Sequence, residues 1–279
     1  MHRVDEIPDW IRSLLSSRAE TPIEIHDVTV RAAVANKRTY RLVFDGGRQA
    51  KARLLMGSEH AARWGDLRRR VGELPFLSSL VLQSGTAVLE EWVEGEVLPH
   101  ANPPENLLQK AGAVLARIHR TPVPEQEMAD AGPEAAKICS MLSALTRLSA
   151  ITQGDADELT ARLSKKQPKR MHRGLAHHDF CGENLVVHFS RGVVSIDHEW
   201  MRVGSLDFDV ARAIRQWSLP DAGIDFFLRG YAAAGGPVEI AHLDFWLLAN
   251  DIFASEVRVR RGWPDAPATV KRLMSWIDR

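Results

Sequence analysis

The order of apolar and polar positions predicts a β-rich structure for the first hundred residues. Apolar and β-branched residues are concentrated in short runs that are typical of strands. These runs cover residues 23–30, 39–45, 48–55, 79–83 and 86–93. Gly46 and Gly47 separate two of them and predict a tight hairpin, because glycine adopts the positive φ that such turns require. A helix is predicted over residues 59–73, with Ser58 as its cap and Pro75 near its end.

The pattern becomes helical after residue 100. Residues 102–105, Asn-Pro-Pro-Glu, predict a helix start with the asparagine as cap, and apolar residues then recur on one helical face. Further helices are predicted over residues 133–149, 155–165, 206–218, 224–234, 239–261 and 267–278. Two short strands, residues 185–189 and 193–196, interrupt this part. We therefore expect an α+β fold with a small β-rich lobe (residues 1–94) and a larger helical lobe (residues 95–279).

Four polar residues form the most informative pattern in the chain. His177, Asp179 and Asn184 lie in the run HHDFCGEN, and Asp197 lies in the run SIDHEW. Asp179 and Asn184 precede one short strand and Asp197 follows the next, so a hairpin would bring both segments to one edge. Kinase-type phosphoryl transfer needs a carboxylate that accepts the proton of a hydroxyl, and an amide and a second carboxylate that bind Mg²⁺. The spacing predicts Asp179 as the base and Asn184 and Asp197 as the metal ligands.

These segments resemble the aminoglycoside phosphotransferase and choline kinase superfamily, a group of small-molecule kinases with a protein-kinase-like fold. The resemblance covers most of the chain and includes TYRLVF, VLEEWVEGEVL, VLARIHRTP and GSLDFDVA. It implies a two-lobed protein-kinase-like fold, ATP or GTP and Mg²⁺ as cofactors, and a small hydroxylated molecule as acceptor. His178 departs from the pattern, because members commonly have glycine between the motif histidine and aspartate. No Walker A motif is present, which excludes the common P-loop architecture.

The resemblance also implies roles for residues around the two motifs. His177 would brace the loop without taking part in the chemistry. Asp209 would be a buried carboxylate that ties the loop to the following helix. Glu91, Trp92 and Val93 would form the hinge between the lobes, where backbone groups meet the edge of the adenine ring.

Two basic residues are candidates for the contact with the α- and β-phosphates. Lys51 and Arg53 are two positions apart on one predicted strand, so both side chains point to the same face. A lysine would act as a point charge, whereas an arginine could bind phosphate through two nitrogens. Glu59, on the next helix, would hold the chosen cation by an ion pair.

The acceptor site is expected on the helical side, within residues 206–261. Asp244 and Asp251 are seven positions apart on a predicted helix and therefore share a face. Together they would form an acidic wall that suits an acceptor carrying an amine.

Two other classes of protein use part of the same residues. His177, His178, Asp179 and His198 could be ligands in a metal-dependent His-Asp phosphohydrolase. That fold is helical around its metal, whereas strands flank these residues here. A kinase-like protein that binds nucleotide without catalysis is the second alternative, but it would not need the complete catalytic set.

Composition limits the partners further. Lys+Arg and Asp+Glu are equal at 36 each, which argues against nucleic acid or an anionic membrane as the main partner. No apolar run approaches the length that crosses a bilayer, and the first residues include acidic side chains and a proline, unlike a secretory signal. The two cysteines, Cys139 and Cys181, form no disulfide framework and suit a reducing cytoplasm.

Overall fold

The computed structural model describes most of the chain as two compact units. The described residues are 7–16, 18, 20–29, 38–99, 103–123, 134–169, 171–217, 219–238, 240 and 242–278. The first unit, called the N-unit, combines Met1–Leu98 with Glu183–Arg202. The second, called the C-unit, combines Pro99–Gly182 with Val203–Arg279. The hairpin within 183–202 thus belongs to the N-unit, and the predicted lobe division at residue 94 stays a prediction.

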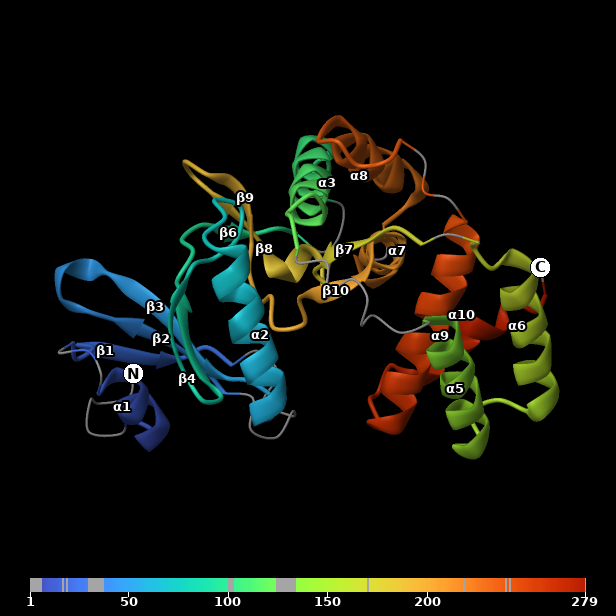
Figure 1. Ribbon diagram of the computed structural model, residues 1–279, viewed down its shortest axis with the longest axis horizontal. Helices are drawn as coiled ribbons and strands as arrows, with labels where there is room; N and C mark the ends of the chain where they lie inside the picture. The colour runs from blue at the N-terminus through green and yellow to red at the C-terminus, as the bar shows by residue number, and fades with distance from the viewer. Residues whose placement is uncertain are drawn as a thin grey trace. The chain divides into compact units, whose positions relative to one another are not determined.

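The N-unit is built on an antiparallel sheet of five strands (Figure 1). In spatial order they are β1 (Glu24–Asp27), β2 (Thr39–Val43), β3 (Gln49–Leu54), β5 (Ala87–Glu91) and β4 (Leu80–Ser84). The five predicted strands are confirmed; four are shorter than predicted, and β4 is shifted by one residue. A 3₁₀ turn, η2 (Asp45–Gly47), joins β2 to β3. Gly46 and Gly47 have φ values of 73° and 79° there, as the hairpin prediction required.

Alternation along β3 sends its side chains to opposite faces of the sheet. Ala50 and Ala52 belong to a core that α1 (Asp9–Leu15) completes with Ile11 and Leu14. On the other face, α2 (Ser58–Val71) packs Ala61 and Trp64 against Leu55 and Val88. Helix α1 was not predicted. The N-cap position of α2 is Gly57, with a φ of 79°, and the expected cap Ser58 is the first helical residue.

The remaining strands of the N-unit form a second, three-stranded sheet. Its order is β6 (Glu96–Val97), β8 (Leu185–His188) and β9 (Gly192–Ser195). The predicted hairpin is therefore present, and Leu185 is paired with Ser195. A short 3₁₀ turn, η3 (Gly182–Asn184), leads into β8.

The C-unit is mainly helical, as predicted. Its helices are α3 (Glu105–His119), α5 (Glu134–Arg147), α6 (Gln153–Lys166), α7 (Leu206–Trp217), α8 (Asp221–Ala233), α9 (Leu243–Arg260) and α10 (Ala266–Met274). Pro104 is the N-cap residue of α3, so both prolines precede the helix, and the predicted cap Asn102 lies outside the described residues. Across the described ranges, no helix is long and apolar enough to span a membrane.

Two features of the C-unit position its functional loop. A pair of strands, β7 (Arg173–Ala176) and β10 (Arg202–Ser205), places the segment after Ala176 beside the start of α7. Helices α3 and α8 lie against each other (Figure 1). Their close approach depends on glycine, since a Cβ at Gly230 would lie 1.9 Å from the carbonyl oxygen of Gln109.

Candidate active site

Asp209 anchors the loop that follows β7. Its carboxylate has no exposed surface and accepts hydrogen bonds from the backbone N–H groups of His177 at 2.6 Å and His178 at 2.8 Å. His119 Nε2 donates a third at 3.1 Å, while His119 Nδ1 lies 2.8 Å from the hydroxyl of Tyr231. The predicted role of Asp209, a buried tie between the loop and α7, is confirmed.

The charge of Asp209 is stabilised by these contacts. Burial by itself would raise the pKa of this carboxyl group. The hydrogen bond from His119 and the nearby imidazoles of His178 and His177 outweigh that effect and hold the pKa below its usual range. An ionised carboxylate therefore fixes the backbone at the start of the loop.

His177 and Asp179 occupy the turn that Asp209 holds. The His177 ring is fully buried, packs edge-on against Phe180, and its Nδ1 accepts a hydrogen bond from the backbone N–H of Asp179 at 3.2 Å. His178 adopts a φ of 60°, which turns the chain sharply before Asp179. The Asp179 side chain is 26% exposed, so it reaches solvent while the backbone beneath it is fixed.

Helix α7 supplies two contacts to Asp179 that sequence reasoning missed. Gln216 Nε2 donates to Asp179 Oδ1 at 2.8 Å, and Arg212 Nη2 donates to the same oxygen at 3.3 Å. Arg212 also stacks over the ring of Phe253, at 4.8 Å from its centroid. A signal was available, because Asp209, Arg212 and Gln216 have the i, i+3, i+7 spacing of one helical face.

A second charged cluster lies within the N-unit, around Arg53. The Arg53 side chain is 5% exposed, and its Nε donates to Glu90 Oε2 at 2.7 Å. Its Nη1 lies 2.5 Å from Asp197 Oδ1 and 3.3 Å from Glu199 Oε2. Lys51 Nζ is 3.5 Å from the same Asp197 oxygen, which confirms that both basic residues face the same way. Nη2 of Arg53 is buried and has no hydrogen-bond partner among the described residues.

The prediction that Glu59 forms an ion pair with this cation is wrong. Glu59 lies in the first turn of α2 with 85% of its side chain exposed, and its carboxylate pairs with Arg63 one turn later. Glu90, on the adjacent strand β5, holds Arg53 in its place. A first-turn glutamate is favoured on a helix by the dipole alone, so its position in the sequence gave a false signal.

The hairpin of the N-unit brings Asn184 and Asp197 together, as the spacing predicted. The backbone N–H of Ile196 donates to the carbonyl of Asn184 at 2.9 Å, so the two candidate ligands flank one hydrogen-bonded pair. Asp197 has a φ of 62°, a conformation uncommon for a residue with a side chain and frequent at functional sites. An amide oxygen and a carboxylate are the hard ligands that Mg²⁺ prefers, so this pair fits the expected metal.

The predicted hinge follows β5. Glu91 is tied by its carboxylate to Arg191, at 2.5 Å, and to the backbone N–H of Ser79, at 3.1 Å. The guanidinium of Arg41 lies over the Trp92 ring, with its Cζ atom 5.1 Å from the ring centroid. Among the described residues, neither Trp92 nor Val93 makes a backbone–backbone hydrogen bond. The role of Glu91, Trp92 and Val93 as a hinge for adenine stays a prediction.

The predicted acidic wall on α9 does not form. Asp251 is fully buried and is bound by Arg272 at 2.7 Å, by Arg215 at 3.4 Å and by Trp276 Nε1 at 2.8 Å. Asp244 is exposed and pairs with Lys166 at 2.9 Å. The prediction that the two carboxylates bind a cationic acceptor is therefore wrong for Asp251, whose charge is neutralised inside the helical core.

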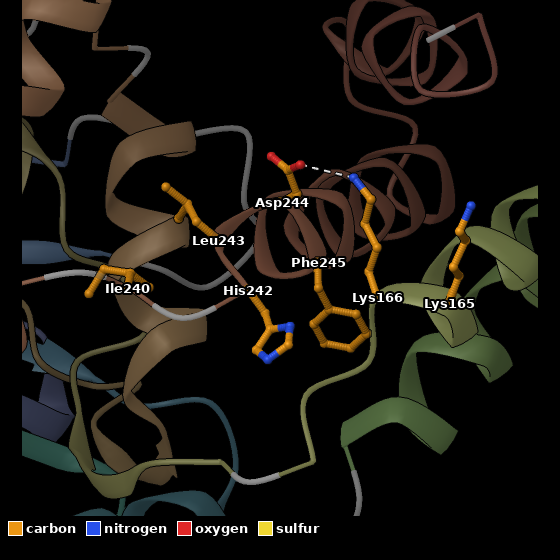
Figure 2. Close-up of a pocket in the computed structure, with 7 residues that line it drawn as sticks. All are labelled: Lys165, Lys166, Ile240, His242, Leu243, Asp244 and Phe245. Carbon is orange, nitrogen blue, oxygen red and sulfur yellow. Dashed lines mark hydrogen bonds and ion pairs between the residues drawn. The ribbon is translucent and has the colours of Figure 1, made fainter.

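Figure 2 shows the surroundings of Asp244. This residue lines a pocket at the start of α9, where the dashed line joins its carboxylate to Lys166. The lining residues are Lys165, Lys166, Ile240, His242, Leu243, Asp244 and Phe245. Cations outnumber carboxylates there, which does not suit an amine-bearing acceptor.

His198, one residue of the rival metal site, has an ordinary structural role. The His198 ring is fully buried; its Nε2 lies 3.1 Å from the carbonyl of Ser195, and its own carbonyl accepts from Trp64. Across the described ranges, no group of three or more His, Cys, Asp or Glu side chains is arranged to hold a metal ion. Cys181 is buried, with Gln216 Nε2 at 3.6 Å from its sulfur.

The described site thus consists of two halves, each within its own unit. Asp179 and its supporting residues belong to the C-unit, and the cation cluster, the predicted hinge and the predicted metal ligands belong to the N-unit. That both halves serve one reaction stays a prediction of the sequence.

A β-sheet unit with a buried strand cation and a helical unit with an anchored aspartate loop define the protein-kinase-like class of phosphotransferases. The family model of the Phosphotransferase enzyme family matches residues 77–246. The chain therefore belongs to the Phosphotransferase enzyme family, and the prediction of a small-molecule kinase is confirmed. No curated protein matches the sequence.

Solved structures show the same fold at low sequence identity. Choline kinase LicA from Streptococcus pneumoniae is 14% identical, with a TM-score of 0.75 over 97% of this chain and 98% of that one. Macrolide 2′-phosphotransferase MphH from Brachybacterium faecium is 17% identical, with a TM-score of 0.65 over 94% and 98%. Spectinomycin phosphotransferase APH(9)-Ia, in complex with ADP and spectinomycin, is 15% identical, with a TM-score of 0.64 over 97% and 94%. The predicted protein-kinase-like α+β fold is confirmed.

Proposed function

We propose that the protein transfers the γ-phosphoryl group of ATP to a hydroxyl group of a small molecule. The observation that carries this proposal is the Asp179 carboxylate, partly exposed on a loop fixed by Asp209 and gripped at one oxygen by Gln216 and Arg212. A rigidly held carboxylate orients an attacking hydroxyl and accepts its proton, and positioning of this kind supplies most of the catalysis in phosphoryl transfer.

The N-unit provides groups that suit a nucleotide. Arg53 is fixed by carboxylates on one side and keeps a buried, unpartnered N–H at Nη2, which a phosphate oxygen would satisfy. The backbone of Trp92 and Val93 would meet the adenine edge. Similar structures in complex with AMP and with ADP and spectinomycin support a nucleotide in this fold. GTP is the alternative phosphoryl donor.

Mg²⁺ would be held by Asn184 and Asp197. When bound, it would neutralise charge on the nucleotide phosphates. Arg53 and Lys51 both contact Asp197 Oδ1, so these two side chains supply the positive charge beside that carboxylate. Metal and nucleotide together would supply that charge, and the N–H groups that Arg53 and Lys51 direct at Asp197 would become available to the phosphates.

The acceptor is an alcohol, either an antibiotic or a metabolite. The expectation that it carries an amine loses its support, because Asp251 is buried between two arginines and Asp244 is paired with Lys166. Arg212, a cation in contact with the catalytic carboxylate, favours an acceptor whose reacting end is uncharged or negative.

Substitution of Asp179 by asparagine tests the proposal. The variant should bind MgATP as tightly as wild type, because the groups proposed to bind nucleotide and metal are unchanged. Its rate of transfer should fall by about 10²–10⁴, the usual cost of removing a general base. ADP release measured with a panel of hydroxylated compounds, with mass detection of the phosphorylated product, gives the rate. A non-catalytic nucleotide-binding protein would bind MgATP and phosphorylate nothing in such a panel, with no difference between the two proteins.

A further inference from the structure

The buried ion pair around Arg53 differs from the arrangement usual in protein kinases. There the strand cation is held by a glutamate on a helix, and movement of that helix makes or breaks the pair. Here the first-turn glutamate of α2, Glu59, is exposed and bound to Arg63. The structure assigns the anchoring of Arg53 to Glu90 on β5, with Glu199 as a second support, so that the phosphate-binding cation is fixed within the sheet. This inference rests on the nucleotide site proposed above.

The register of the sheet explains why Glu90 reaches Arg53. Lys51 lies directly opposite Glu90, and Arg53 lies opposite Val88. Directly opposed residues in an antiparallel pair share a face, and diagonal neighbours are within reach of long side chains. Lys51, Arg53 and Glu90 therefore emerge from one face of β3 and β5, and the longer Arg53 spans the diagonal to make the 2.7 Å contact.

Burial makes this contact the dominant one for Arg53. Glu90 is 1% exposed and Glu199 6% exposed, whereas Asp197, the third carboxylate, is 36% exposed. Burial opposes the charge of the guanidinium, but Glu90, Asp197 and Glu199 together raise its pKa. Since Asp197 is the expected metal ligand, it is the partner that nucleotide and Mg²⁺ would draw away. Glu90 and Glu199 would then remain to balance and orient Arg53.

The consequence is a cation whose anchor lies within the sheet and not on α2. β3 and β5 are joined by backbone hydrogen bonds along their length, from the Ala50–Glu91 pair to the Leu54–Ala87 pair. The backbone positions of Glu90 and Arg53 are therefore fixed by the sheet itself. Glu90 is accordingly a positioning residue for nucleotide binding, and Glu59 has no such role.

Three single variants test this assignment: Glu90→Gln, Glu199→Gln and, as the matched control, Glu59→Gln. Each is titrated with ADP and with adenosine by calorimetry. Loss of the buried anchor should weaken ADP binding by about tenfold or more, in line with the cost of truncating one partner of a buried charge pair. Adenosine has no phosphate, so its affinity should be unchanged in all three variants. Glu59→Gln should bind both ligands as wild type does.

The outcomes separate the possible failures. A wild-type protein that binds neither ligand would overturn the proposed nucleotide site itself. If the wild type binds ADP, and Glu90→Gln binds it with an unchanged dissociation constant, the anchoring role is wrong. A purely structural role for Glu90 would reduce the fraction of binding-competent protein and leave the dissociation constants of the competent fraction unchanged, which also overturns the inference. Should Glu90→Gln fail to fold, Glu199→Gln decides: a selective loss of ADP affinity supports the carboxylate anchor, and wild-type affinity contradicts it.

Discussion

Asp209 offers a test of how the C-unit holds its catalytic loop. In Asp209→Asn the side chain keeps its shape but loses its charge and one acceptor oxygen. Oδ2 of the native residue accepts from His177 N and His119 Nε2, and Oδ1 accepts from His178 N. An asparagine carbonyl can take the Oδ2 position, but its amide group then faces the N–H of His178, donor against donor.

The cost follows from these contacts. One buried N–H is left unsatisfied, at about 1–3 kcal/mol, and two charge-assisted bonds become neutral ones, at about 1 kcal/mol each. The sum is about 3–5 kcal/mol, or roughly 6–20 °C in the Tm of a unit of this size. Loosening of the loop should also reduce phosphoryl transfer, because Asp179 follows His178 directly.

Asp207→Asn is the matched control. Asp207 lies on the same helix and is also buried, but its contact is to His172, 3.3 Å away and 59% exposed. Burial raises the pKa of Asp207, so its charged form is disfavoured and asparagine is a closer substitute. Thermal unfolding followed by circular dichroism should show a much smaller loss for this variant. Equal stability of Asp209→Asn and wild type, or a larger loss in Asp207→Asn, would refute the reasoning.

The same carboxylate predicts a dependence on pH. The pKa of Asp209 is lowered in the folded state, so its contribution is complete above the unfolded value of about 3.9 and is lost as pH falls toward the folded value. The Tm difference between wild type and Asp209→Asn should therefore be constant from neutral pH down to about pH 5 and shrink below about pH 4. A difference that grows in acid would show that the charge of Asp209 does not stabilise the fold.

Two further variants test the remaining contacts of the C-unit. Asp251→Asn should lose about 1–3 kcal/mol of stability, since its arginine partners are partly exposed, and leave the acceptor KM unchanged; a raised KM at unchanged Tm would return Asp251 to the acceptor site. Gln216→Leu should lower kcat by about tenfold through loss of one hydrogen bond to the Asp179 carboxylate, with MgATP affinity retained. Gln153→Leu, on the exposed start of α6, is the control, and equal kcat in both variants would argue against the contact.

The local features of the fold could be predicted from the sequence. The five strands of the N-unit and the hairpin β8–β9 have strand-forming residues bounded by turn residues, and Gly46 and Gly47 adopt the φ values that their positions suggested. The role of Asp209 was implied by the family resemblance of the segment GSLDFDVA, and its hydrogen bonds to the adjacent loop confirm it. Helix α1 was missed, although Ile11, Leu14 and Leu15 are buried at helical spacing.

The long-range contacts could not be predicted in the same way. The choice of Glu90 over Glu59 depends on the register of β5 against β3, which places Glu90 diagonally across from Arg53, and neither strand alone determines this register. Asp251 looked available on its helix, but Arg215 and Arg272 reach it from two other helices. A carboxylate on a helix face therefore says little about a binding site until its cationic partners are known.

The reaction proposed for this protein is Asp179-dependent phosphoryl transfer from ATP to an alcohol. The most direct measurement incubates wild type and Asp179→Asn with γ-labelled MgATP and a panel of hydroxylated compounds, and follows the label into a product. We predict a labelled phosphate ester with wild type, its loss by about 10²–10⁴ in Asp179→Asn, and equal MgATP affinity for both proteins. Transfer at the wild-type rate by Asp179→Asn would contradict the claim.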